Sequence, residues 1–226
     1  GGYIMGSADT DFAAAFAQHC DTTVISVEYR LAPEHPFPAA HNDCHAAYLW
    51  LHEHAQELGV DATRIAVGGE SAGAGLAAGL VLRNRDEQGP DIAFQFLLYP
   101  MLDNLHATHS GAIEEYPIWN RRTSLNAWEM YLNGTPGAQA SAHAAPARAK
   151  DVSGLPNTYL TVGAVDLLRD EAIEYAQRLM AAGVPTQLAV YPGLYHGAEL
   201  MVPDAAISRE MTSAYVAALK NALHPL

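Results

Sequence analysis

Short apolar runs alternate with longer amphipathic segments along most of this chain, and glycine or proline separates many of them. The apolar runs predict five strands, which cover residues 22–29, a segment beginning near 64, and residues 92–99, 157–163 and 186–191. Helical patterns follow most of these runs, over about 12–19, 39–58, the segment after 73, 168–182 and 204–223. Such alternation predicts an α/β fold, with a mostly parallel sheet covered by helices on both faces.

The alternation stops between residues 102 and 151. This segment is long for a connection and contains four large aromatic residues, Tyr116, Trp119, Trp128 and Tyr131. Insertions of this size are uncommon unless they are functional. We therefore divide the chain into a core, residues 1–101 and 152–226, and an inserted helical cap, residues 102–151. The aromatic residues suit ordinary packing of the cap and the roof of an acyl pocket equally well.

Composition narrows the class of protein. The chain has 226 residues, half of them hydrophobic and 16% charged, which fits a compact globule and not a disordered chain. Its formal charge of −13, with only 12 basic residues, disfavours nucleic acid and anionic membranes as partners. No run of 18 apolar residues predicts a membrane span. Cys20 and Cys44 have no paired spacing, so we expect free thiols in a reducing, cytoplasmic compartment.

The stretch from Arg64 to Gly79 joins an apolar strand, the turn Gly-Glu-Ser-Ala-Gly at 69–73, and a helix of small residues. Gly-x-Ser-x-Gly between a strand and a helix is typical of a nucleophile elbow, in which a strained turn exposes the serine hydroxyl. No other serine in the chain has these flanks. Ser71 is therefore the candidate nucleophile. The neighbouring Glu70 either tunes it or orients the turn.

A serine hydroxyl is a weak nucleophile at neutral pH, so Ser71 needs a base, and the base needs an orienting acid. Asp166 directly follows the predicted strand 157–163, and His196 follows the strand 186–191 and a Pro-Gly turn. The order Ser, Asp, His is that of α/β-hydrolases, and the carboxyl ends of parallel strands meet at one edge. Singly, Asp166 could be a helix cap and His196 a turn residue. The weaker candidates are acids in the next helical turn and histidines elsewhere, namely Asp170, Glu171, His106, His109, His143 and His224.

Four segments resemble one family. The elbow at 69–73, the proline-rich stretch 28–40 (Glu-Tyr-Arg-Leu-Ala-Pro-Glu-His-Pro-Phe-Pro-Ala-Ala), Asp166-Leu-Leu-Arg-Asp-Glu171 and Tyr191-Pro-Gly-Leu-Tyr-His196 are similar to motifs of the hormone-sensitive-lipase-like α/β-hydrolases, the bacterial family IV esterases. The chain departs from the family in Gly197-Ala198, where an aromatic residue is common. The resemblance implies a serine carboxylesterase that uses Ser71, His196 and Asp166 on short- to medium-chain esters or lactones, without cofactor or metal.

The first residues, Gly1-Gly2-Tyr3, resemble the end of the family's His-Gly-Gly-Gly motif and its following aromatic. The resemblance places the oxyanion-hole N–H groups on Gly1, Gly2 and Ala72. It also implies that the family's first strands and N-terminal cap helices are missing from this chain. A sheet edge exposed in this way predicts either association between copies, as in a homo-oligomer, or low stability. Tyr3, Glu70, Leu167 and Tyr195 are candidate residues of the substrate pocket.

Other interpretations remain open. The same three residues serve amidases and acyltransferases, and some members of the family bind a hormone without catalysis after losing the histidine. His41 and His45 have the i, i+4 spacing of a helical zinc site, but Asn42 stands where the His-Glu-x-x-His motif needs a glutamate, so we expect a helix surface. We expect the charged residues of the proline-rich stretch, Glu28, Arg30, Glu34 and His35, to satisfy a buried backbone.

Overall fold

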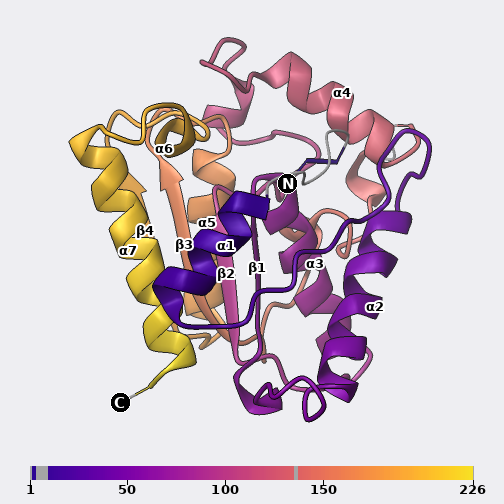
Figure 1. Cartoon of the computed structure of the whole chain (residues 1–226). Coiled ribbons are helices and arrows are strands. Elements are labelled where there is room, and N and C mark those ends of the chain that lie inside the picture. The colour runs from indigo at the N-terminus through magenta and orange to yellow at the C-terminus, as the bar shows by residue number, and fades with distance from the viewer. Residues whose placement is uncertain (1, 4–9, 135–136, 226) are drawn as a thin grey trace.

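The computed structural model describes residues 2–3, 10–134 and 137–225. It contains a four-stranded parallel sheet of order β1-β2-β3-β4, formed by Ala66–Glu70, Phe94–Leu98, Asn157–Gly163 and Thr186–Tyr191 (Figure 1). Gly68 lies beside Phe96, Phe96 beside Tyr159, and Tyr159 beside Gln187. Every residue of β2 is buried, as expected of a parallel strand covered on both faces. The prediction of an α/β fold is confirmed.

Helices cover both faces of the sheet (Figure 1). The helices α1 (Thr10–Cys20) and α7 (Ala206–Leu223) pack together on one face, while α3 (Ala72–Asp86) and α5 (Arg169–Ala181) cover the other. The helix α2 (Ala39–Glu53) packs against α3, and α6 (Ala198–Met201) is a single turn before α7. No helix in the described ranges is both long and apolar enough to cross a membrane.

Residues 22–29 do not form the buried strand that their β-branched side chains predict. The structure assigns no regular secondary structure to residues 23–31, and Val24 and Ile25 are 38% and 41% exposed. β-Branched residues favour a strand only where a neighbouring strand supplies hydrogen bonds and a packed face. In the described part of the chain, β1 is the edge strand of the sheet, and residues 22–29 do not pair with it or with any other strand. The prediction of a fifth strand here is therefore wrong.

The proline-rich stretch is irregular, as predicted, but its charged residues do not lie in the interior, where they would satisfy a buried backbone. Glu28, Glu34 and His35 are exposed. The guanidinium of Arg30 instead holds Asp43 of α2, with Nη2 to Oδ1 at 2.7 Å and Nε to Oδ2 at 2.9 Å. This ion pair ties the stretch to α2 and is itself partly exposed.

The expectation that His41 and His45 lie on a helix surface is also wrong. They are 1% and 5% exposed, and His41 Nδ1 lies 3.4 Å from the Arg83 guanidinium of α3. Glycine is required at position 79 of α3, because a Cβ there would lie 2.1 Å from the His143 carbonyl oxygen and 3.3 Å from His41 Nε2. Burial lowers the pKa of His41 to about 4. Among the described residues, no cluster of three or more metal-ligating side chains occurs.

The described residues of the segment 102–151 form α4 (Arg121–Tyr131) and three short 3₁₀ turns, Ser110–Ala112, Gly137–Gln139 and Pro146–Arg148. In Figure 1, α4 lies beyond the carboxyl ends of the strands. Trp128 and Tyr131 on α4 are buried, and Tyr131 stacks on Tyr3 with ring centroids 3.8 Å apart. These two aromatic residues therefore pack the interior. The division into core and cap stays a prediction.

Candidate active site

Ser71 occupies a strained turn between β1 and α3. Its φ of 53° and ψ of −120° lie in a region that non-glycine residues rarely adopt. Its N–H donates to the Leu98 carbonyl at 2.9 Å, and its own carbonyl accepts from the N–H of Met101 at 3.1 Å. The turn also requires glycine at 69, where a Cβ would lie 2.5 Å from the Gly73 carbonyl carbon. The elbow predicted from the sequence is present in this conformation.

The structure brings Ser71, His196 and Asp166 into one line of hydrogen bonds. Ser71 Oγ lies 2.9 Å from His196 Nε2, and His196 Nδ1 lies 2.9 Å from Asp166 Oδ2. An ionised aspartate only accepts hydrogen bonds, so Nδ1 carries the proton and Nε2 is free to accept the serine proton. This arrangement can move a proton from the hydroxyl to the imidazole.

Asp166 comes shortly after β3 and is fully buried. Its second oxygen, Oδ1, accepts the N–H of Leu168 at 2.9 Å, which fixes the carboxylate plane toward His196. The rejected acids have other partners. Asp170 accepts the N–H of Ser110 at 2.7 Å, and Glu171 accepts that of Leu102 at 2.7 Å.

The competing histidines for which the structure gives partners also contact other groups. His106 faces Glu171 at 3.6 Å, His143 faces Asp86 at 2.9 Å, and His224 contacts the Cys20 carbonyl at 3.0 Å. None of these contacts involves Ser71 or Asp166.

The electrostatic setting of His196 favours its protonated form. Burial lowers the pKa of His196, but nearby carboxylates outweigh this effect, Asp166 first and then Glu199 and Glu70, so the pKa lies above its usual value. The imidazolium that forms when Ser71 loses its proton is therefore stabilised.

Two aromatic rings face the imidazole of His196. Tyr99 meets it edge-on with centroids 4.9 Å apart, and Trp119 of the inserted segment lies at 5.9 Å. Of the four aromatic residues in the insertion, Trp119 is thus close to the site, whereas Trp128 and Tyr131 are interior. Sequence reasoning missed Tyr99 and Glu199. Tyr99 ends a predicted strand and Glu199 lies three residues after His196, which are the only signals in the sequence.

The three N–H groups predicted to form the oxyanion hole differ in how available they are to a substrate. Gly1 lies outside the described residues. The Gly2 N–H donates to the Tyr29 hydroxyl at 3.1 Å, and that hydroxyl donates to the Gly2 carbonyl at 3.0 Å. Gly2 can serve an oxyanion only if this bond to Tyr29 is exchanged. Ala72 opens α3, where an N–H has no intrahelical acceptor and the helix dipole favours negative charge.

The four predicted pocket residues have different environments. Tyr3 and Leu167 are buried in one hydrophobic cluster, and Tyr195 packs against the larger core cluster. Glu70 is partly buried, and its Oε2 lies 3.2 Å from the Tyr99 hydroxyl oxygen. The structure therefore places Glu70 beside the histidine and Tyr3 and Leu167 in the interior.

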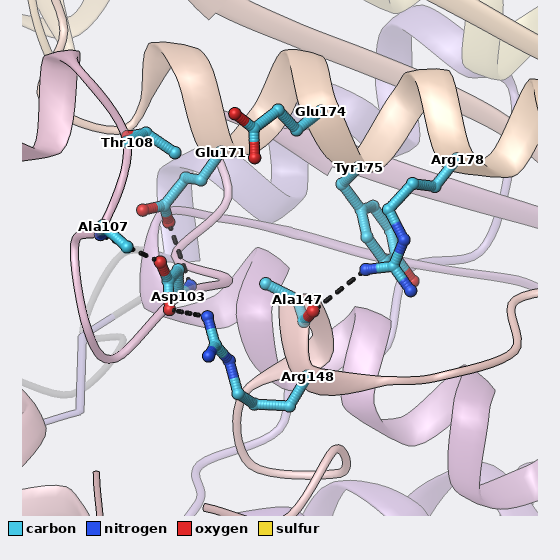
Figure 2. Close-up of a pocket in the computed structure, with 9 residues that line it drawn as sticks. All are labelled: Asp103, Ala107, Thr108, Ala147, Arg148, Glu171, Glu174, Tyr175 and Arg178. Atoms are coloured by element: carbon cyan, nitrogen blue, oxygen red, sulfur yellow. Dashed lines mark hydrogen bonds and ion pairs between the residues drawn. The ribbon is translucent and has the colours of Figure 1, made fainter. Parts of the chain in front are cut away.

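A separate polar cavity of about 150 Å³ lies between α5 and the 103–108 and 146–148 segments (Figure 2). Asp103 and Arg148 form an ion pair at its wall, and Glu171 and Arg178 also line it. Neither Ser71 nor His196 is among its lining residues. Its charged wall does not suit an apolar acyl group, so we do not assign it to the substrate.

Comparison with known proteins places this site in a family. A family model described as the α/β-hydrolase fold matches residues 1–200. Esterase LipI of Mycobacterium tuberculosis strain H37Rv is 38% identical, over 99% of this chain and 71% of that protein. Carboxylesterase NlhH of the same strain is 40% identical, over 99% of this chain and 72% of that protein.

Solved structures of esterases also resemble this chain closely. A bacterial heroin esterase superposes with a TM-score of 0.95 and 45% identity, covering 99% of this chain and 73% of that one. Esterase LipW from Mycobacterium marinum superposes with a TM-score of 0.93 and 38% sequence identity, covering 100% of this chain and 71% of that one.

Proposed function

Since the chain belongs to the hormone-sensitive-lipase-like family of α/β-hydrolases, we propose that it is a serine carboxylesterase. It cleaves short- to medium-chain carboxylic esters or lactones through an acyl-enzyme. The observation that carries the proposal is the line of hydrogen bonds from Ser71 through His196 to Asp166, each 2.9 Å long. The names of the relatives, esterase and carboxylesterase, support ester bonds as the target.

The first half-reaction forms the acyl-enzyme. Ser71 Oγ attacks the ester carbonyl carbon while His196 Nε2 takes the hydroxyl proton. The negative charge moves to the carbonyl oxygen, and the tetrahedral intermediate collapses as His196 returns the proton to the departing alcohol. Throughout, Asp166 accepts the hydrogen bond from the Nδ1–H group of His196. This bond keeps the proton of the neutral imidazole on Nδ1 and stabilises the imidazolium when it forms.

The second half-reaction restores the enzyme. A water molecule attacks the acyl carbonyl while His196 Nε2 takes its proton, and the acid leaves when Ser71 Oγ regains a proton from His196. We assign the oxyanion donors to the N–H groups of Ala72, Gly2 and Gly1, with Ala72 as the principal one. Removing one such donor typically costs about 3–4 kcal/mol of transition-state stabilisation.

Labelling with a fluorophosphonate followed by peptide mapping tests the nucleophile. The wild-type chain gives a single adduct on Ser71, and Ser71→Ala gives none. An adduct on another serine of the wild-type chain would overturn the assignment.

Turnover of p-nitrophenyl butyrate against the matching anilide separates esterase from amidase activity. We expect the ester to react far faster. If the protein turns over no short ester at all, this would instead favour a binding protein of this fold.

We also propose a cytoplasmic location and association between copies. The free thiols of Cys20 and Cys44 support a reducing compartment, and exposed apolar side chains such as Val24, Ile25 and Trp50 support association. Light scattering during size-exclusion chromatography tests the oligomer, and a monomeric mass at micromolar concentration would refute it.

A further inference from the structure

Tyr99 lies in a strained conformation directly behind the imidazole of His196. It follows β2 with a φ of 37°, in the left-handed region, and only 3% of its surface is exposed. An aromatic residue held in this region marks strain that the surrounding structure must maintain. Its ring meets the imidazole at 71°, with centroids 4.9 Å apart. The strained residue therefore touches the proposed general base.

The hydroxyl of Tyr99 joins two carboxylates from different segments. It lies 2.7 Å from Glu199 Oε1 on α6 and 3.2 Å from Glu70 Oε2 at the end of β1. A hydroxyl has one proton, and the shorter contact assigns it to Glu199. Glu199 is buried and comes three residues after His196, so this bond ties the histidine loop to the end of β2.

We propose that Tyr99 is a positioning residue for His196, which acts by anchoring Glu199 at the end of the histidine loop and by supporting the edge of the imidazole. This inference rests on the proposed function, because it gives His196 the role of general base. It adds to that function a residue outside the Ser71–His196–Asp166 line.

The charges around His196 explain why the anchor matters. The pKa values of Tyr99 and His196 are influenced by ionisable side chains from four separate segments of the chain, namely Asp166, Glu70, Glu199 and Tyr215. Burial raises the pKa of Glu199, while the bond from Tyr99 opposes this effect. The bond from Tyr99 thus opposes protonation of Glu199 and holds it in place, and a negative charge on Glu199 favours imidazolium formation at His196.

The test compares Tyr99→Phe with Tyr175→Phe. Both changes remove one hydroxyl from a buried tyrosine, but the Tyr175 hydroxyl has no hydrogen-bond partner in the described structure. For p-nitrophenyl butyrate, we expect Tyr99→Phe to lower kcat at least about tenfold with KM changed less than about twofold. We expect Tyr175→Phe to match the wild type.

The pH profile separates positioning from a general loss of structure. In Tyr99→Phe, Glu199 protonates more readily, so the acid limb of kcat/KM shifts to lower pH. Glu199→Gln still accepts from Tyr99 but carries no charge. We therefore expect it to show the same downward shift of the acid limb.

A ¹⁵N titration of the His196 imidazole reads the same pKa without substrate, so it remains decisive if the chain hydrolyses no ester. Wild-type protein that fails to label or turn over would contradict the proposed function alone. The positioning role is wrong if Tyr99→Phe has the same kcat as Tyr175→Phe. It is also wrong if Tyr99→Phe and Glu199→Gln leave both the acid limb of kcat/KM and the imidazole titration unchanged.

Discussion

Replacing Asp166 by asparagine tests the proposed mechanism at its buried end. Asp166 accepts two N–H groups, His196 Nδ1 and the backbone of Leu168, each at 2.9 Å. Asparagine has only one carbonyl oxygen. We expect this oxygen to accept the buried Leu168 N–H, because a buried donor without an acceptor would destabilise the folded state. The amide NH₂ then faces His196 and requires Nδ1 to be an acceptor. Nε2 consequently carries the proton and can no longer accept one from Ser71.

The expected loss is large because the base is held in the wrong tautomer. The same substitution in a serine protease lowers kcat by about 10⁴-fold, which corresponds to about 5 kcal/mol of barrier. We expect a loss of this order in kcat for p-nitrophenyl butyrate, with KM little changed, because Asp166 lies behind the histidine.

Asp170→Asn is the matched control for this substitution. Asp170 is partly exposed and pairs with Arg169 and Ser110, so the change should cost less than about fivefold. Initial rates are measured on folded protein, with fluorophosphonate titration to count sites. An Asp166→Asn variant within tenfold of wild type, or an equal loss in Asp170→Asn, would refute the assignment.

Three further predictions follow from the site and its support. The pKa of His196 lies above its usual value near 6.5, so kcat/KM should fall as pH drops through a midpoint above 6.5; a lower midpoint in a rate profile from pH 5 to 9 would contradict this. His41 has a folded pKa of about 4, so the unfolded state gains its proton first and stability falls as pH drops below 6.5. Between pH 7 and 5, urea denaturation should show about 2 kcal/mol more loss in wild type than in His41→Leu; equal losses would refute the assignment. Gly69→Ala places a Cβ 2.5 Å from the Gly73 backbone, so we expect lost fluorophosphonate labelling and lower stability, and normal labelling would disprove the tight turn.

The sequence predicts those parts of the fold whose signal is local. The apolar runs at 157–163 and 186–191 match β3 and β4 at both ends, because each run is bounded by turn residues. Residues 22–29 carry the same kind of signal without forming a strand. Whether β-branched residues pair depends on a neighbouring strand, and that neighbour is not encoded in the run itself.

The candidate site divides in the same way. Ser71, Asp166 and His196 could each be picked out because each follows a strand, and the carboxyl ends of parallel strands converge. Tyr99 and Glu199 are far apart in sequence and meet only because the end of β2 lies near the start of α6. The buried His41 is likewise a product of helix packing, which an i, i+4 spacing does not report.

The end of β2 connects the three loops that carry the proposed chemistry. Its Leu98 carbonyl accepts the N–H of Ser71, and the N–H of Tyr99 donates to the Thr161 carbonyl of β3, shortly before Asp166. The side chain of Tyr99 then reaches the histidine loop through Glu199. Ser71 and Tyr99 directly follow the adjacent strands β1 and β2, and both have positive φ, so the backbone is strained at the ends of both strands. Because β2 is buried along its length, the sheet can hold this strain, and the register between β1, β2 and β3 sets the distance from nucleophile to acid.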